Sequence, residues 1–133
     1  KPVLTGEHIV MAQKLIHRMP VCDQVVGYAC AIVRSSRPKQ PNSLEFVNKY
    51  VNWGSGPRGV LALITAAKAR ALLHGRYHAS VEDIQAIIRP ALRHRLAPNY
   101  AALAAGIDTE KLIDMLLEAI PAQKKFEPPG EKE

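Results

Sequence analysis

The sequence is poor in the features that define several large classes of protein. Only 2 of its 133 residues are cysteines, too few for a disulfide framework or a cysteine-based metal site. Its 5 histidines are scattered without metal-binding spacing, so we expect no metal site. No apolar run could span a bilayer and no signal-peptide pattern is present, so we expect a soluble, cytoplasmic protein that does not contact membranes.

The glycine-rich loops by which many proteins bind nucleotides are also missing. There is no G-x-x-x-x-G-K-[ST] phosphate loop and no G-x-G-x-x-G fingerprint, and no two side chains can be argued together as a catalytic dyad. We therefore expect that the chain is not an enzyme by itself and cannot hydrolyse a nucleotide alone. Its first residue, Lys1, is not methionine, which suggests a piece of a longer protein.

Acidic residues are absent from a long central stretch, residues 46–81. Residues 24–107 hold eleven Lys or Arg against three Asp or Glu, whereas residues 108–133 hold four basic against seven acidic residues. A basic middle with an acidic end suits a polyanionic partner, either the phosphates of a nucleotide or a nucleic acid. The simpler interpretation is that most of these charges form a solvated surface.

Apolar residues recur at helical spacing along most of the chain, and no segment alternates convincingly as a strand. We expect an all-α, compact bundle of about six helices in residues 5–121, after a linker at 1–4 and before a flexible tail at 122–133. Caps and breakers place helices at about 5–19, 22–33, 43–51, 57–74, 80–89, 100–105 and 109–120. Ser43 is the expected cap of the third helix, and Pro90 should break or kink the fifth.

The helix at about 57–74 is the most apolar, with Leu61 among its expected core residues, and should form the spine of the bundle. Gly56 is its expected N-cap and Pro57 its first residue, which places Arg58 in the first turn. That turn carries the positive end of the helix dipole, so a cation is unfavourable there unless an anion also binds. Backbone amides and an arginine would form a phosphate site. The alternative is that Arg58 simply extends into solvent.

Four blocks of sequence then point to a known family. WGSGPR, an alanine-rich helix ending in LLHGR, SVEDI and LRHRL follow one another between Trp53 and Leu96. They resemble the C-terminal helical lid domain of MoxR-type AAA+ ATPases, in which the pattern reads approximately W-G-A-S-P-R-A, G-R, T-P-x-D-I and L-x-H-R. The resemblance runs in order from about Thr5 to Ile120.

The resemblance implies a function for the segment around Arg58. In that family the lid packs over ATP held, with Mg, by a separate P-loop core domain, which here would precede the linker at 1–4. Arg58 would be the sensor-2 residue, a catalytic contact to the γ-phosphate, and Gly54 and Pro57 would shape the nucleotide-binding turn. Loss of the γ-phosphate would release the lid, with the Val3 and Leu4 side as the hinge.

The resemblance also implies partners. The parent protein would be an ATPase with chaperone-like activity in remodelling or maturing other proteins. Its partners would be its own N-terminal P-loop domain, neighbouring subunits of a hexameric ring, and a protein bearing a von Willebrand A domain. Gly56 replaces the usual serine and Gly59 the usual alanine, which indicates a looser arginine turn.

Several residues of the four blocks have two interpretations. Arg76, His94 and Arg95 could contact a neighbouring subunit, but salt bridges to Glu82 or Asp83, or exposure to solvent, are the simpler interpretation. Trp53 is expected to anchor the core rather than to contact adenine. The competing hypothesis for the whole chain is a stand-alone basic helical module that binds nucleic acid. Pro90 counts against it, because it interrupts the most basic candidate for a recognition helix, residues 89–95.

Overall fold

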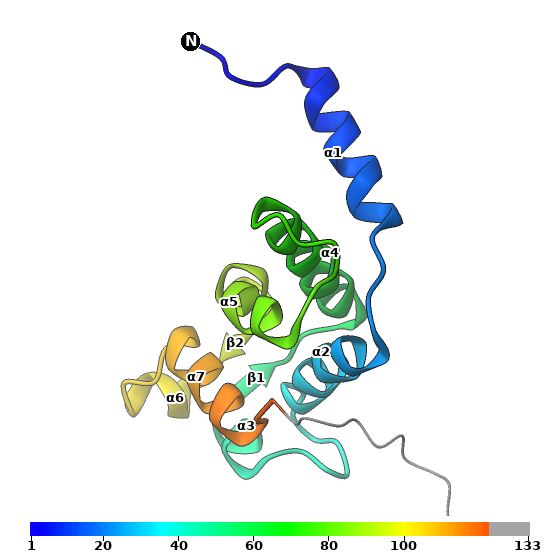
Figure 1. Cartoon of the computed structure of the whole chain (residues 1–133). Coiled ribbons are helices and arrows are strands. Elements are labelled where there is room, and N and C mark those ends of the chain that lie inside the picture. Colours follow the sequence, from blue (N-terminus) through cyan, green and yellow to red (C-terminus); the bar gives the residue numbers. More distant parts are fainter. Residues whose placement is uncertain (123–133) are drawn as a thin grey trace, which may run out of the picture.

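The computed structural model describes residues 1–122, so the tail expected at 122–133 lies outside the described residues except for Ala122. The described part is all-α, as predicted, with one very small sheet (Figure 1). The helices are α1 (Gly6–Arg18), α2 (Asp23–Ser35), α3 (Glu45–Tyr50), α4 (Pro57–Leu73), α5 (Val81–Leu92), α6 (Tyr100–Ala104) and α7 (Thr109–Ala119). The strands are β1 (Val51–Trp53) and β2 (Ala97–Pro98), paired antiparallel.

The helix ends follow the local signals in the sequence. Ser80 and Asp83 form a reciprocal capping box at the start of α5, where each side chain binds the backbone N–H of the other residue. Gly75, after α4, and Gly106, after α6, have φ angles of 69° and 67°. This left-handed conformation strains residues with a Cβ, so glycine ends both helices at little cost.

Three local predictions were wrong. Leu44 rather than Ser43 precedes α3, because the Ser43 hydroxyl is used inside the preceding loop, where it donates to the carbonyl of Arg37 at 2.8 Å. The break expected at Pro90 is absent, because α5 continues to Leu92; only two residues follow the proline, so little helix depends on the bond that it removes. The two strands were also missed, since each is too short to show an alternating pattern.

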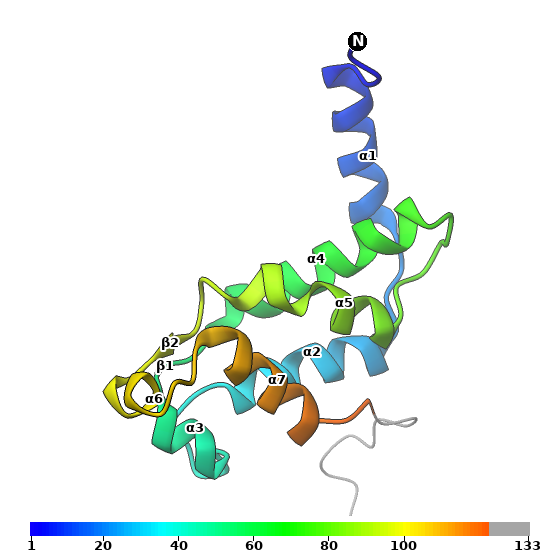
Figure 2. The same ribbon diagram turned by 90° about the vertical axis from the view of Figure 1, so that its left-hand side faces the viewer.

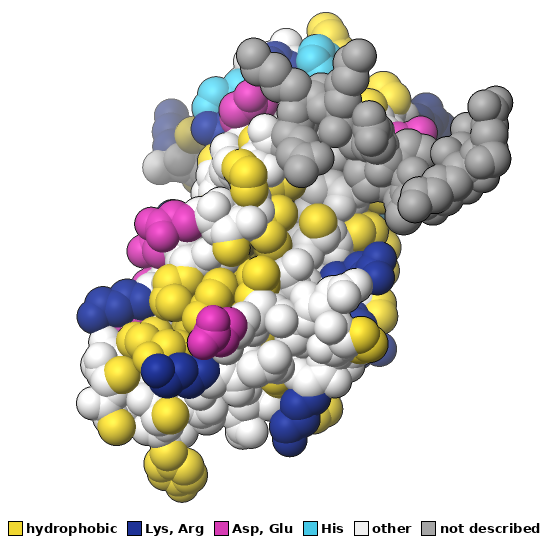
Figure 3. Space-filling model, turned by 90° about the horizontal axis from the view of Figure 1, so that it is seen from below, with side chains coloured by type: hydrophobic (Ala, Val, Ile, Leu, Met, Phe, Trp, Pro, Cys, Tyr) yellow, Lys and Arg dark blue, Asp and Glu magenta, His cyan; other side chains and the backbone are white. Residues whose placement is uncertain are grey.

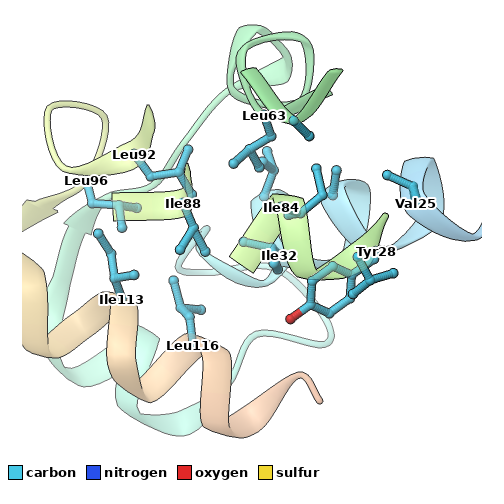
Figure 4. Close-up of a cluster of buried hydrophobic side chains, with 14 of the residues drawn as sticks. Val25, Tyr28, Ile32, Leu63, Ile84, Ile88, Leu92, Leu96, Ile113 and Leu116 are labelled. Atoms are coloured by element: carbon cyan, nitrogen blue, oxygen red, sulfur yellow. The ribbon is translucent and has the colours of Figure 1, made fainter. Parts of the chain in front are cut away.

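The core lies between α2, α4, α5 and α7 (Figure 4). Its fully buried side chains include Ile32, Leu63, Ile84, Ile88 and Leu116. The core also includes a polar group, that of Tyr28, whose hydroxyl donates to the carbonyl of Ile120 at 3.2 Å and accepts from the Gln85 amide at 3.2 Å. Burial raises the pKa of this phenol, and its two bonds join α2 to α5 and to the end of α7.

Helix α4 lies against α5, α2 and α1, but only one narrow stripe of it is buried. The stripe consists of Gly59, Leu63, Ala67 and Ala71, four residues apart, and its small side chains allow the close approach of α5. Leu61, which was expected in the core, is 66% exposed. The helix is therefore one wall of the core and not a spine enclosed on all sides.

Helix α1 extends away from the rest of the molecule (Figures 1 and 2). The sequence predicted the helix correctly, but none of its residues is buried in the described chain. Ile9, Val10, Met11 and Leu15 are each about half exposed or more. Met19, directly after the helix, is the first residue to enter the core.

The opposite side of the molecule, near α3 and α7, carries a mixed surface. Seen from below, hydrophobic side chains gather in its middle, with charged side chains around them (Figure 3). Among residues 1–122, none of the helices combines the length and the apolar character that crossing a bilayer requires.

Candidate functional site

Arg58 is an exposed side chain in the first turn of α4. As predicted, Gly56 is the N-cap and Pro57 begins the helix, and no side chain caps the free amides of that turn. The first turn holds no acidic residue, and the Arg58 guanidinium has no hydrogen bond or ion pair within residues 1–122. The arginine therefore lies at the positive end of a helix, and no anion of the described residues neutralises it.

A cavity of about 630 Å³ opens in front of Arg58. Gly54, Pro57 and Arg58, the three residues singled out from the sequence, all line it. The remaining lining residues are Trp53, Gly56, His94, Arg95, Leu96 and Ala97. The part of the chain that the structure describes contributes two arginines and a histidine to the lining but no carboxylate, so the cavity favours an anionic ligand.

The small sheet brings the second half of this lining into place. β1 pairs with β2, with Val51 opposite Pro98 and Trp53 opposite Ala97. The turn after α5, which carries His94 and Arg95, thereby lies beside the start of α4. Sequence reasoning did not place these two residues beside Arg58, because the sheet that joins them has no detectable pattern. The LRHRL block was the one available signal.

Trp53 also differs from its prediction. It was expected to anchor the core, yet its side chain is 73% exposed and lies on the lining of the cavity. The neighbouring β1 residue Val51 is the one that is buried. Residues two apart in a regular strand point to the same face, but the bulge between Val51 and Trp53 breaks that rule here and leaves the indole outside.

The turn before Arg58 is held firmly by the loop that follows α2. Ser55 is almost fully buried, at 1% exposure. Its N–H donates to the Ser36 hydroxyl at 3.0 Å, and its carbonyl accepts from Arg37 Nε at 2.7 Å. Ser36, itself buried, donates its hydroxyl to the carbonyl of Val33 at 2.7 Å. Helix α2 thus fixes the backbone from which α4 begins.

The prediction of a looser arginine turn rested on Gly56 and Gly59, and at Gly59 it was wrong for a steric reason. A Cβ on Gly54 would overlap the backbone oxygen of Ser36, and one on Gly59 would overlap the hydroxyl of Ser55. Ser55 stands where the family pattern has alanine, and its hydroxyl occupies the space that the missing Cβ of Gly59 leaves. The two departures from the pattern compensate for each other, so the turn is tightly packed.

The variant Gly54→Ala is expected to lower the free energy of unfolding by about 2–3 kcal/mol, because backbone and not a flexible side chain occupies the space of its Cβ. Gly56→Ala is the matched control in the same turn. A Cβ there meets nothing within 4 Å, and the change should cost no more than about 0.5 kcal/mol. Urea unfolding measures the free energy of unfolding of both variants. Equal decreases in the two variants would contradict the close packing of Gly54 against Ser36.

The pair Ser55 and Gly59 gives a second test of the same packing. Gly59→Ala alone is expected to destabilise the fold by about 1 kcal/mol, because the Ser55 hydroxyl must move away. Ser55→Ala combined with Gly59→Ala should restore at least the original stability, since alanine is the better helix former. A double-mutant cycle measures the coupling, which we expect to be about 1 kcal/mol. Additive effects would mean that the two positions do not compensate.

Arg76 belongs to a separate, structural cluster. Its guanidinium binds both oxygens of the buried Asp83, at 2.8 and 2.6 Å, and Arg70 Nη1 adds a bond of 2.6 Å. The simpler interpretation of Arg76, a salt bridge to Asp83, is therefore confirmed. These bonds, first of all those from Arg76, hold the pKa of Asp83 well below its usual range. The cluster joins α4 to α5.

No group of three or more potential metal ligands occurs among residues 1–122.

Taken together, the described residues form a small helical domain with an open cavity, lined by two arginines and a histidine, at the start of α4. Residues 45–115 match the model of the AAA lid domain. The chain belongs to the AAA lid family, and it is a lid domain of the MoxR-type AAA+ ATPases.

Individual relatives agree with this assignment. The chain is 30% identical over 137 residues to a protein named chaperone MoxR1 from Mycobacterium tuberculosis, covering 97% of this chain and 36% of that protein. It is 38% identical over 78 residues to protein MoxR from Methylorubrum extorquens, covering 57% of this chain and 22% of that protein. A protein from Cytophaga hutchinsonii, assigned as an ATPase, has a similar structure, with a TM-score of 0.75 and 28% identity over 81% of this chain and 33% of that one.

Proposed function

We propose that this domain closes over ATP held by a P-loop core domain, with Arg58 as the sensor-2 residue that reaches the γ-phosphate. The observation that carries the proposal is the guanidinium of Arg58 at the start of α4, which has no partner among residues 1–122 and faces a cavity to which these residues contribute no carboxylate. A guanidinium there can stabilise phosphate charge and respond to the presence of the γ-phosphate. Gly54 and Pro57 shape the turn that presents it.

The core domain would supply the remaining chemistry. It would hold ATP and Mg, and hydrolysis would release the lid, in a domain closure around the segment that contains Val3 and Leu4. The chain spans only 36% of the MoxR1 protein, so the relatives have room for such a domain. The exposed apolar side chains of α1, which are Ile9, Val10, Met11 and Leu15, support a contact with it.

The parent protein would then be a cytoplasmic ATPase that remodels or matures other proteins, as the name chaperone MoxR1 suggests for one relative. Its subunits would assemble into a hexameric ring, and a protein with a von Willebrand A domain would be among its partners. The deciding measurement for the lid itself is ATP turnover of the full-length protein with and without the Arg58 side chain.

The competing hypothesis of a nucleic-acid-binding module loses support from the ion pairs of α5. Arg89 and Arg93, the most basic part of the candidate recognition segment, face α7 and pair with its acids. Arg93 Nε lies 3.0 Å from Glu110, and Arg89 binds both Glu110 and Asp114. A basic surface that is neutralised in this way offers little to a phosphate backbone.

A further inference from the structure

The Arg58 cavity contains a second cation whose position is fixed. Arg95 donates through Nε to the carbonyl of Ala91 at 3.2 Å, and the side chain is half-buried. Neither terminal nitrogen of Arg95 has a partner within residues 1–122. One end of the guanidinium is thus held by the last turn of α5, while its other two nitrogens remain available to a ligand in the cavity. A donor held in this way loses little entropy when it binds.

The same cavity has an aromatic wall. Trp53 is the single tryptophan of the chain, and its side chain is 73% exposed although it sits in a paired strand. A large aromatic surface left in water is unfavourable, and beside two arginines it forms the usual arrangement for stacking on a nucleobase while cations bind the phosphates.

We propose that Trp53 and Arg95 bind the nucleotide together with Arg58, with the indole stacked on the base and Arg95 on a phosphate. The ligand is a purine nucleoside triphosphate, for which the cavity of about 630 Å³ has a suitable size. The proposal rests on the proposed function, because it names two further contacts of the same site. In this arrangement Arg95 and Trp53 contribute to the affinity for the nucleotide, whereas Arg58 responds to the presence of the γ-phosphate.

The first experiment is steady-state kinetics of the full-length protein. Arg95→Ala and Trp53→Leu are each expected to raise the KM for ATP about tenfold, with kcat within about threefold of the original value. Trp53→Leu should also reduce the preference for ATP over CTP, because the larger purine gains more from stacking. Arg93→Ala is the matched control: it is an exposed arginine in the same turn, it pairs with Glu110, and it does not line the cavity.

The second experiment uses Trp53 as its own reporter. In the 133-residue chain, ATP and adenosine are expected to quench the tryptophan emission, whereas inorganic tripolyphosphate should compete with ATP without quenching. Arg95→Ala should raise the dissociation constant of ATP about tenfold and leave that of adenosine unchanged. Helical circular dichroism of each variant checks that it is folded.

The outcomes separate this proposal from the function on which it rests. If Arg58→Ala reduces turnover but Arg95→Ala and Trp53→Leu behave like Arg93→Ala, the lid function stands and the present proposal is wrong. If Trp53 and Arg95 affect ATP binding but Arg58 has no effect on turnover, the cavity binds the nucleotide without acting as a sensor. Absence of quenching by millimolar ATP and adenosine would overturn the stacking. A single-stranded oligonucleotide that bound more tightly than ATP at physiological salt would assign the cavity to nucleic acid instead.

Discussion

Arg58→Ala in the full-length protein is expected to lower ATP turnover by about 10- to 100-fold while the domain remains folded. The size follows from the loss of one charge-assisted contact to the phosphate on which negative charge develops, a barrier increase of about 1.4–2.7 kcal/mol. Stability should not fall, because the Arg58 side chain is exposed and makes no bond within residues 1–122. Steady-state turnover at saturating ATP and urea unfolding of the same variant measure the two effects separately.

Two further variants make the result specific. Arg34→Ala removes another exposed arginine, one that does not line the Arg58 cavity, and it should leave turnover within about twofold. Arg58→Lys keeps the charge but loses the paired donors, so it should recover turnover only in part. Turnover of Arg58→Ala equal to that of the original protein would exclude the sensor role.

Asp83→Asn is expected to cause the largest loss of stability of any single substitution proposed here, about 3 kcal/mol. The Asp83 side chain is completely buried and accepts hydrogen bonds from Arg70, from Arg76 and from both the N–H and the hydroxyl of Ser80. Asparagine removes the negative charge and leaves two arginines without their partner. In a domain of this size, the melting temperature should fall by roughly 10 °C.

The pH dependence of the same cluster has a definite sign. Because the folded protein depresses the pKa of Asp83, its stabilising contribution is complete above the unfolded pKa of about 4. It is lost as the pH falls from there towards the lower folded pKa. The free energy of unfolding of the original protein should therefore decrease between about pH 4 and 2, and that of Asp83→Asn should decrease less. Glu82→Gln, an exposed neighbour in the same turn, is the control and should keep most of the stability at pH 7.

The sequence predicted what depends on local chemistry. The capping box of Ser80, the glycine after α4 and the proline that begins it are each decided within a few residues, and the expected helix starts near residue 80 and at Pro57 are confirmed. Arg58 was identified because a cation in the first turn of a helix contradicts a simple electrostatic rule. Its place on an open cavity agrees with that interpretation.

What the sequence could not predict depends on contacts between distant residues. The pairing of β1 with β2 brings Arg95 to the Arg58 cavity across nearly the whole of α4 and α5, and its strands are too short to leave a periodic pattern. The exposure of Trp53 follows from a bulge in that pairing. The tight packing of Gly59 against Ser55 could not be predicted, because it depends on where the Ser55 hydroxyl lies, and Gly59 alone resembles a loosening substitution.

The isolation of α1 has a mechanical consequence. A helix of 13 residues is about 20 Å long and stiff, and here it is linked to the other described helices by the short segment that follows Arg18 and by its contact with α4. A rotation of about 10° around that segment would displace the far tip by roughly 3 Å, by simple geometry from the same rise per residue. The helix is thus built as a lever arm, able to turn a small angular change at one end into a translation large enough to make or break a side-chain contact at the other.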